Sequence, residues 1–247
     1  MQIYSAIQRG EYHLNNCEDF LFNGKIGKNK TVCAVMDGCT MGVDSHFAST
    51  MVGKMLRKIC RQFDYLEFYQ SELSTLSLEQ YSKIIFQELF KELKLCRNQL
   101  LLDKRELLTT LVFSIFDTAT STGFIMAVGD GLISINGEIT EFDQDNKPDY
   151  VGFHLDENFE DWYLAQKQKI KLDSVEDVSI ATDGILTFTR ILETKTPEII
   201  DPISFMVSEP ITVVDEETLN KRLKTIEHVY GLKPSDDFAM IRIVNNN

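Results

Sequence analysis

Apolar and polar positions alternate with two periods along this chain, one typical of β-strands and one typical of helices. Asn-Gly pairs at Asn23-Gly24 and Asn136-Gly137 predict hairpin turns, because this dipeptide readily adopts tight-turn conformations. The segments with strand character are Gln2–Gln8, Thr31–Met36, Leu107–Phe116, Gly123–Val128, Leu132–Ile135, Ile139–Phe142, Asp177–Ala181 and Phe238–Val244. Their short spacing around residues 107–142 predicts antiparallel pairing.

Three longer segments carry apolar residues at helical spacing. They are Ser45–Phe63, Leu78–Leu102 and Glu216–Tyr230, the last followed by Gly231 as a C-terminal cap. Asp64–Ser77 is expected to be a linker, and Gln144–Lys171 and Ile185–Val214 have no clear period. Runs of strands interrupted by pairs of helices favour an α+β layered fold.

Composition and charge narrow the function classes. The chain has 247 residues, of which 43% are hydrophobic and 26% charged, as in ordinary globular proteins. A formal net charge of −13 argues against nucleic acid as a partner, because phosphate-backbone binding needs a basic surface. The sequence shows no signal-peptide pattern and no apolar run of membrane-spanning length, so no membrane association is expected.

The cysteines indicate the compartment. Five cysteines, an odd number without Cys-x-x-Cys spacing, favour reduced thiols in a cytoplasmic protein over a disulfide framework or a structural zinc site.

Acidic residues recur at the ends of the predicted strands. Asp37 and Asp183 each end a strand and precede glycine, Glu18-Asp19 precede a short apolar run, and Asp236-Asp237 open the last strand. Strand ends can bring side chains from distant positions onto one site, and Mg²⁺ or Mn²⁺ prefer oxygen ligands. Each carboxylate taken alone is equally consistent with an ordinary turn residue.

Five motifs in order resemble those of the metal-dependent serine/threonine protein phosphatases, the PPM or type 2C family. They are Cys-Glu-Asp at 17–19, Asp-Gly-Cys-Thr-Met-Gly at 37–42, Ala-Val-Gly-Asp-Gly at 127–131, Ala-Thr-Asp-Gly-Ile at 181–185 and Pro-Ser-Asp-Asp-Phe-Ala at 234–239. The resemblance covers essentially the whole chain, and Thr109-Thr110 also fits it. It implies a single domain over residues 1–247, a four-layer αββα sandwich in which two antiparallel sheets are flanked by helix pairs.

The resemblance also implies two Mn²⁺ or Mg²⁺ ions. Asp37 is expected to bridge them, with Gly38 offering its carbonyl and Glu18 its carboxylate to one ion. Asp19 is expected beside that ion or just behind it. Asp183 and Asp236 are expected to hold the other ion, and Asp130 to share a third, weaker ion with Asp183.

Two positions depart from the family pattern. The Arg that usually grips the substrate phosphate is replaced by Leu14, next to His13, so His13 is a candidate for the phosphate contact. The His that often follows Asp-Gly is replaced by Cys39, and His46 at the start of the next helix is an alternative acid. Cys39 as a nucleophile is disfavoured, because no His and Asn partners stand at motif spacing.

The implied function is hydrolysis of phosphoserine or phosphothreonine on a protein by metal-activated water, with a cognate serine/threonine kinase as a possible partner. The first alternative is a phosphatase-fold binding module with low or no activity that senses phosphorylated partners. The missing Arg and His favour it, and the retained carboxylates oppose it. A small-molecule phosphatase is the third reading.

Overall fold

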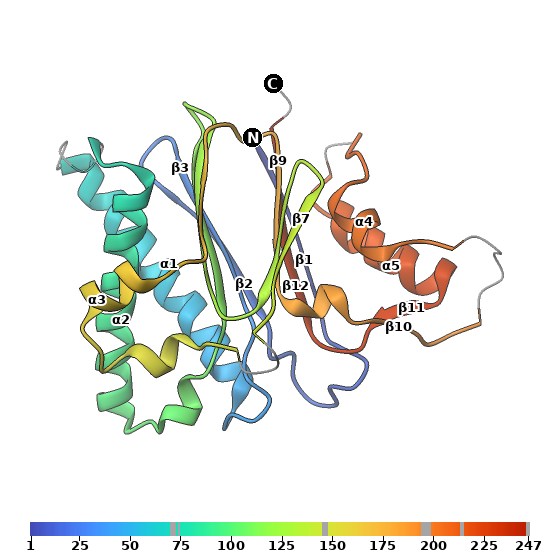
Figure 1. Ribbon diagram of the computed structural model, residues 1–247, viewed down its shortest axis with the longest axis horizontal. Helices are drawn as coiled ribbons and strands as arrows, with labels where there is room; N and C mark the ends of the chain where they lie inside the picture. Colours follow the sequence, from blue (N-terminus) through green and yellow to red (C-terminus); the bar gives the residue numbers. More distant parts are fainter. Residues whose placement is uncertain (70–72, 74, 145–147, 194–198, 213–214, 246–247) are drawn as a thin grey trace.

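The computed structural model describes residues 1–69, 73, 75–144, 148–193, 199–212 and 215–245. Within these ranges two five-stranded antiparallel sheets face each other, and helices cover the outer face of each (Figure 1). The expected α+β class and four-layer αββα sandwich are therefore confirmed. No helix in these ranges is long and apolar enough to cross a membrane.

The first sheet has the strand order β2-β3-β4-β5-β8. Its strands are β2 (Phe20–Ile26), β3 (Lys30–Met36), β4 (Leu111–Asp117), β5 (Thr122–Val128) and β8 (Lys169–Leu172). Helices α1 (Ser45–Tyr69), α2 (Leu78–Leu100) and α3 (Phe159–Ala165) lie on its outer side (Figure 1). Every residue of β3 is buried, which explains its continuous apolar run where a one-sided strand would alternate.

The second sheet has the strand order β1-β12-β9-β6-β7. Its strands are β1 (Gln2–Gln8), β6 (Gly131–Ile135), β7 (Glu138–Phe142), β9 (Asp177–Ala181) and β12 (Phe238–Val244). Helices α4 (Pro202–Val207) and α5 (Thr218–Tyr230) cover it, and β10 (Phe188–Arg190) pairs with β11 (Leu232–Pro234) beside them. The short helices η2 (Lys104–Leu107), η3 (Val151–His154) and η4 (Asp183–Leu186) complete the connections.

Apolar side chains fill three layers. One cluster lies between α1, α2 and the first sheet and includes Leu89 and Phe113. A second lies between the two sheets and includes Val35 and Ile241. A third joins the second sheet to α4 and α5. Burial of the apolar faces of both sheets is what holds the four layers together.

Three expectations about local structure are wrong. The strand expected over Leu107–Phe116 begins only at Leu111, because Leu107 ends the short helix η2. Asn23-Gly24 lies inside β2, and the turn follows at residues 27–29, where Gly27 has a φ of +58°. The pairing of β2 along the whole of β3 overrides the turn preference of Asn-Gly. Helix α1 also continues through Asp64 to Tyr69, where a linker was expected, because Phe63 and Glu67 pack inward against α2 and β3.

The strand directions place several chain segments at one end of the sandwich. Gln8 at the end of β1 pairs with Phe238 at the start of β12, and Ala181 at the end of β9 pairs with Met240. In the first sheet, Met36 at the end of β3 pairs with Phe20 at the start of β2. The loops that carry the predicted acidic residues therefore leave the sheets at the same end.

Candidate functional site

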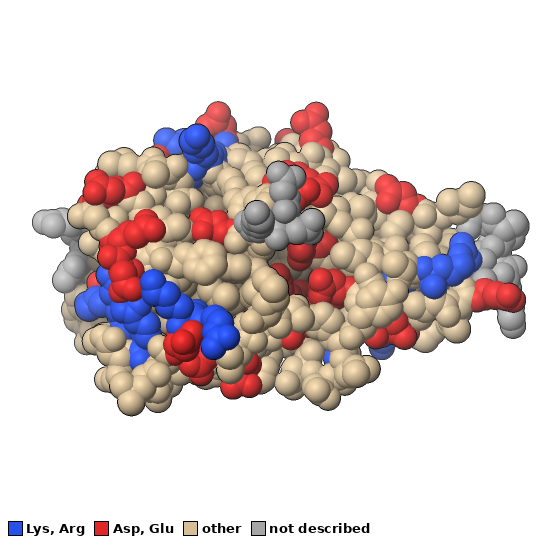
Figure 2. All heavy atoms as spheres, turned by 60° about the horizontal axis from the view of Figure 1, so that its bottom comes forward, with Lys and Arg blue, Asp and Glu red and all other residues tan. Residues whose placement is uncertain are grey.

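The acidic loops meet where the two sheets end. Figure 2 views the molecule toward the end that lies at the bottom of Figure 1, and acidic side chains gather near the middle of this face. Most of these loops lie next to buried strand termini, so the core fixes their positions.

Asp37 follows β3 directly, and its main chain is fixed on both sides. Its N–H donates to Thr110 Oγ1 at 3.2 Å. Its carbonyl accepts from Thr110 N at 2.9 Å and from Thr109 Oγ1 at 2.8 Å. The adjacent threonines before β4 therefore hold the backbone that presents the Asp37 carboxyl.

Gly38 sits where the main chain is tightly packed. A Cβ at this position would lie 2.2 Å from the Ser45 carbonyl oxygen, so only glycine fits. The Gly38 N–H donates to the Glu18 carbonyl at 3.2 Å, and Ser49 Oγ donates to the same carbonyl. Glu18 and Gly38 are thereby brought side by side, and their expected roles as ligands of one ion stay a prediction.

Asp19 is buried and has only one of its oxygens satisfied. Thr182 Oγ1 donates to Asp19 Oδ2 at 2.6 Å and accepts from Ala239 N at 2.9 Å. No donor among the described residues reaches Asp19 Oδ1. Thr182 therefore ties the segment before β2 to the ends of β9 and β12, and one buried carboxylate oxygen remains open.

Asp183 opens η4, separated from the end of β9 by Thr182, and lies beside the start of β12. A Cβ on Gly184 would lie 1.7 Å from the Asp237 carbonyl oxygen, which explains the glycine of the Asp-Gly pair. Asp236 is held by its N–H, which donates to Thr187 Oγ1 at 3.1 Å.

Asp237 organises the loops instead of facing solvent. Its side chain is 1% exposed. Its Oδ1 accepts from Gly10 N at 2.7 Å, and its Oδ2 accepts from Glu18 N at 2.5 Å. The residue pattern marked Asp236-Asp237 as one acidic site, and the family resemblance assigned a ligand role to Asp236 alone, with no role for Asp237. The two N–H groups satisfied by Asp237 lie in distant segments and become visible only in the folded chain.

His13 lies between two of these carboxylates. Its Nε2 is 3.0 Å from Asp236 Oδ1, and its Nδ1 is 2.8 Å from Asp237 Oδ2. Glu18 Oε2 is farther away, at 4.0 Å from Nδ1. Both ring nitrogens therefore already have acceptors within the acidic centre, and a phosphate contact would have to compete with them.

Asp130 occupies the bend between β5 and β6. Gly129 and Gly131 on either side have φ values of +85° and +156°. Asp130 Oδ1 is buried and has no hydrogen-bond partner among the described residues. Burial raises the pKa of this carboxyl, a backbone hydrogen bond from Gln144 lowers it, and nearby Asp143 and Glu141 raise it further.

Crowding shows in the pKa values of the central carboxyls. Burial and then neighbouring Asp19, Asp183 and Asp236 raise the pKa of Asp37 well above its usual range. Burial also raises the pKa of Asp19, against the opposing hydrogen bond from Thr182. Burial, then Asp236 and Asp130, raise the pKa of Asp183 to about 6. These carboxyls are thus near enough to repel one another when ionised.

The donor set fits a divalent cation. Mutual repulsion between buried carboxylates is relieved by a cation, and the open oxygens Asp19 Oδ1 and Asp130 Oδ1 are hard donors of the kind Mg²⁺ and Mn²⁺ take. Across the described ranges, no group of three or more His, Cys, Asp or Glu side chains is arranged as a ready metal site. The fit therefore rests on the chemistry of the carboxylates and their burial.

A cavity of about 610 Å³ opens beside this centre. Its lining includes His13, Glu18, Thr40 and His46. Thr40 Oγ1 donates to Glu18 Oε2 at 3.0 Å, and the half-buried His46 has Nδ1 3.4 Å from Asn16 Nδ2. The cavity is the space through which a substrate could reach the acidic centre.

The surroundings of Cys39 do not favour a role as a nucleophile. Its side chain is buried and packs with Leu108 and Tyr150, and its N–H donates to the Leu108 carbonyl at 3.1 Å. Burial and then Cys39 raise the pKa of Tyr150. The structure thus places Cys39 in a small apolar cluster next to Asp37.

The family profile described as "Protein phosphatase 2C" matches residues 6–226. No curated protein sequence matches the chain.

Solved structures of bacterial phosphatases share the fold. A bacterial serine phosphatase that carries a point mutation aligns with a TM-score of 0.62 and 14% identity, over 100% of this chain and 99% of that one. The phosphatase domain of SpoIIE from Bacillus subtilis, with a fragment of its regulatory domain, gives a TM-score of 0.55 and 17% identity over 97% of this chain. This chain spans 61% of that SpoIIE chain. RsbX in complex with magnesium gives 0.52 and 14%, over 98% of this chain and 93% of that one.

Proposed function

The chain belongs to the protein phosphatase 2C family, and on that premise we propose that it hydrolyses phosphoserine or phosphothreonine in proteins with two divalent cations. Membership supports a protein phosphatase in general terms. The metal requirement, the type of phosphorylated residue and the roles of individual side chains are the proposal.

One observation carries it. Four distant parts of the chain meet at one centre: after burial, Asp19, Asp183 and Asp236 each raise the pKa of the buried Asp37, and Asp236 also raises that of Asp183. Independent turn residues would not converge in this way. A binuclear metal site is the arrangement that gives such a cluster a chemical use.

The proposed ligand set follows the family pattern. Asp37 would be shared by two ions, Gly38 and Glu18 would serve one, and Asp183 and Asp236 the other. When bound, Mn²⁺ or Mg²⁺ supplies activation of the attacking water and neutralises charge on the phosphoryl group. The magnesium in the RsbX structure supports this choice of ion. Asp130, with its open oxygen, would join Asp183 on a third, weaker ion.

The chain's own groups would hold this arrangement still. Thr109 and Thr110 fix the backbone of Asp37, and Thr182 fixes the carboxyl of Asp19 behind it. Asp237 ties the loops that carry Glu18 and His13 together. Catalysis needs such fixed geometry, since small displacements of a reacting group are costly in rate.

His13 would have two roles at this site. Its contacts with Asp236 and Asp237 would orient these carboxyls, and because His13 lines the cavity, a phosphate oxygen would compete with them for a ring N–H. We propose His13 as the phosphate contact, because Leu14 next to it stands where the family usually has Arg.

The proposal also covers the domain, the protein substrate, the opposing kinase and the location of the protein. Residues 1–247 would act as one phosphatase domain on a phosphorylated protein, with a cognate serine/threonine kinase as the opposing enzyme. The cytoplasmic location expected from the cysteines belongs to the same proposal, and all five cysteines are unpaired in the structure.

The test compares substrates and metals on one preparation. The chain is stripped of metal with a chelator and assayed for phosphate release from phosphoserine and phosphothreonine peptides and from p-nitrophenyl phosphate, with and without Mn²⁺ or Mg²⁺. We expect turnover only with metal, and a preference for phosphopeptides.

Two results would contradict the proposal. Metal-dependent binding of phosphopeptides without turnover would make the chain a phosphatase-fold binding module. Turnover of small phosphate esters with no action on phosphopeptides would make it a small-molecule phosphatase.

A further inference from the structure

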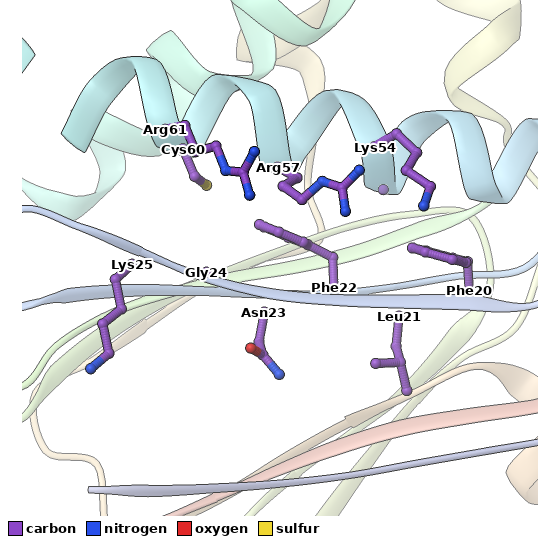
Figure 3. A pocket seen from close by; sticks show the side chains of 11 residues that line it. Phe20, Leu21, Phe22, Asn23, Gly24, Lys25, Lys54, Arg57, Cys60 and Arg61 are labelled. Carbon is purple, nitrogen blue, oxygen red and sulfur yellow. The ribbon is translucent and has the colours of Figure 1, made fainter. Parts of the chain in front are cut away.

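A groove separate from the acidic centre runs between β2 and α1. It has a volume of about 430 Å³, within the range of ligand pockets. Its lining comes from Phe20–Lys25 and from one face of α1 that includes Lys54, Arg57 and Arg61 (Figure 3).

The floor of the groove is an open sheet edge. Strand β2 is the outermost strand of its sheet, and among the described residues its ladder partner is β3 alone. Alternate N–H and C=O groups of an edge strand point outward and can pair with another chain. This edge extends over the seven residues Phe20–Ile26, the length of an ordinary strand.

Small residues keep the space above this edge open. Phe20 and Phe22 point from β2 toward α1, and both line the groove (Figure 3). A Cβ on Gly53 would lie 2.4 Å from the Phe20 ring, and a Cβ on Gly24 would lie 2.5 Å from the Phe22 ring. The two glycines make room for these rings. Phe22 is buried in the core, and the partly exposed Phe20 leaves an apolar surface in the groove.

Positive charge surrounds this surface. Lys54, Arg57 and Arg61 are exposed on α1, at spacings of three and four residues that place them on one face. Lys25 is exposed on β2 and points to the other side of the strand (Figure 3). Of the residues that the structure describes, no Asp or Glu lines the groove, although the chain carries a net charge of −13.

These cations are available to a partner. Within the described residues, Arg57, Arg61 and Lys25 form no hydrogen bond or ion pair. The neighbouring Lys58 differs, because it is paired with Glu92 at 2.5 Å. The nearest carboxylate along α1, Asp64, accepts from the Gly27 N–H at 2.9 Å and does not line the groove.

We propose that this groove binds an extended acidic segment of a partner protein, which adds to the sheet as a strand beside β2. Main-chain hydrogen bonds to the open edge would supply affinity, and alternate side chains would supply specificity. Acidic side chains on one face of the segment would meet Arg57 and Arg61, and those on the other face would meet Lys25, because successive side chains of a strand point to opposite sides. The proposal goes beyond the phosphatase activity and does not depend on it.

The combination of features favours a peptide over other polyanions. A nucleic acid or an anionic membrane can meet the cations but has no backbone amides to pair with an open strand. Charged residues at a sheet edge can also serve only to prevent aggregation. Experiments can distinguish binding of a peptide, binding of another polyanion and protection of the edge against aggregation.

The first experiment measures binding to the intact chain. The probe is a fluorescein-labelled peptide that repeats Glu-Glu-Thr-Thr over the length of β2, so that Glu stands on both faces of the strand. Its binding is measured by fluorescence anisotropy at low salt. We expect saturable binding that the Arg57→Glu/Arg61→Glu variant weakens by about tenfold or more, as for loss and reversal of two complementary charges. The matched control is Lys167→Glu/Lys224→Glu, which makes the same charge change at exposed positions outside the groove and should shift affinity by less than about twofold.

The second experiment tests strand addition. Two versions of the peptide carry N-methyl groups, one at odd and one at even positions. One version lacks the amide N–H groups that would point toward β2, and the other lacks those that would point away from it. One version should bind as the parent peptide does, and the other should lose about tenfold or more. Equal binding of both versions would show a purely electrostatic contact and overturn the proposed strand pairing.

Other outcomes also decide the matter. Absence of peptide binding, with aggregation of the Arg57→Glu/Arg61→Glu variant, would show that the cations only protect the edge. Binding of phosphatidylserine vesicles or of an oligonucleotide through the same arginines, without binding of the peptide, would assign the groove to that ligand and refute the proposal. Circular dichroism of each variant confirms that it is folded, and the experiments remain valid if the chain proves to have no phosphatase activity.

Discussion

His13 and His154 have similar immediate surroundings in different regions of the molecule. His13 lies 3.0 Å from Asp236 and 2.8 Å from Asp237. His154 lies 2.6 Å from Asp149 and 2.9 Å from Glu157. Their side chains are 14% and 17% exposed. A histidine held between two carboxylates is therefore not by itself a sign of a functional site in this chain.

The two histidines differ in the further contacts around them. Asp237 also binds the N–H groups of Gly10 and Glu18, so His13 belongs to the network that positions the acidic loops. The ring of His154 instead lies 5.6 Å from that of Trp162, in the aromatic cluster under α2 and α3. Changes around His13 are expected to alter activity, and changes around His154 to alter stability.

The largest expected effect is at the acidic centre. Asp37→Asn should reduce metal-dependent phosphate release by about a thousandfold or more, because it removes the carboxylate proposed to bridge both ions. The metal-free variant should unfold at a temperature no lower than the parent, since a neutral amide avoids both the burial of a charge and the repulsion that raise the pKa of Asp37. Kinetics at saturating Mn²⁺ and thermal unfolding without metal measure the two effects.

The control for Asp37→Asn is Glu157→Gln in the His154 region, which should keep activity within about threefold. Parent-like activity of Asp37→Asn in a folded protein would remove the metal-bridging role and with it the proposed mechanism.

The next effect concerns His13. His13→Ala should lower kcat/KM by about tenfold, the loss of one charge-assisted hydrogen bond. A rise in KM alone would indicate a phosphate contact. A fall in kcat, with more Mn²⁺ needed for half-maximal activity, would indicate that His13 positions Asp236 and Asp237.

Arg9 supplies the comparison for His13. Its guanidinium donates to the Leu14 carbonyl at 3.0 Å and is exposed, so Arg9→Ala should leave kcat/KM nearly unchanged. The reverse pattern, with His13→Ala unaffected and Arg9→Ala impaired, would move the phosphate contact to Arg9.

A smaller effect, on stability and dependent on pH, is expected at His154. Burial alone would lower the pKa of His154, but hydrogen bonds to Asp149 and Glu157 outweigh it and raise the pKa. A group whose pKa is raised on folding stabilises the protein fully below its unfolded value of about 6.5, and this contribution disappears as the pH rises through the folded value.

His154→Gln should therefore lower the free energy of unfolding by up to about 1 kcal/mol near pH 5.5, after allowance for solvent screening of a partly exposed pair. The difference from the parent should shrink toward pH 9. Urea unfolding at both pH values measures it, and a difference that grows with pH would contradict the assigned direction.

Among the substitutions next to the acidic centre, Cys39→Ser is expected to change activity least. Activity should stay within about threefold of the parent, because the thiol packs with Leu108 and Tyr150 and is not the proposed attacking group. Stability should fall by about 1 kcal/mol, since a hydroxyl replaces a buried thiol. A loss of activity as deep as that of Asp37→Asn would show that Cys39 takes part in the reaction.

Much of the fold could be predicted from local pattern. The strands Gln2–Gln8, Asp177–Ala181 and Phe238–Val244 have the predicted bounds. The hairpin turn at Asn136-Gly137 was also correct, with both residues at positive φ. Period and turn chemistry suffice here because each segment buries one defined set of apolar residues.

The candidate site was accessible from sequence for a related reason. Asp37 and Asp183 end buried strands and precede glycines that the packing requires, so the motif and the local backbone carry the same information. Whether these residues bind metal is still a prediction, since no ready coordination group is present in the described part of the chain.

Only the tertiary structure decided how distant segments share contacts. Asn23-Gly24 became strand because pairing with β3 outweighs a local turn preference, and this leaves β2 as the open edge of the proposed docking groove. Asp237 differs from its neighbour Asp236 because it accepts N–H groups from two other loops. The sequence by itself determined the main strands and the three long helices, apart from some of their ends, and the carboxylates that stand beside them. It could not determine which edge stays open or that Asp237 links two other loops, because both depend on contacts between residues far apart in the chain.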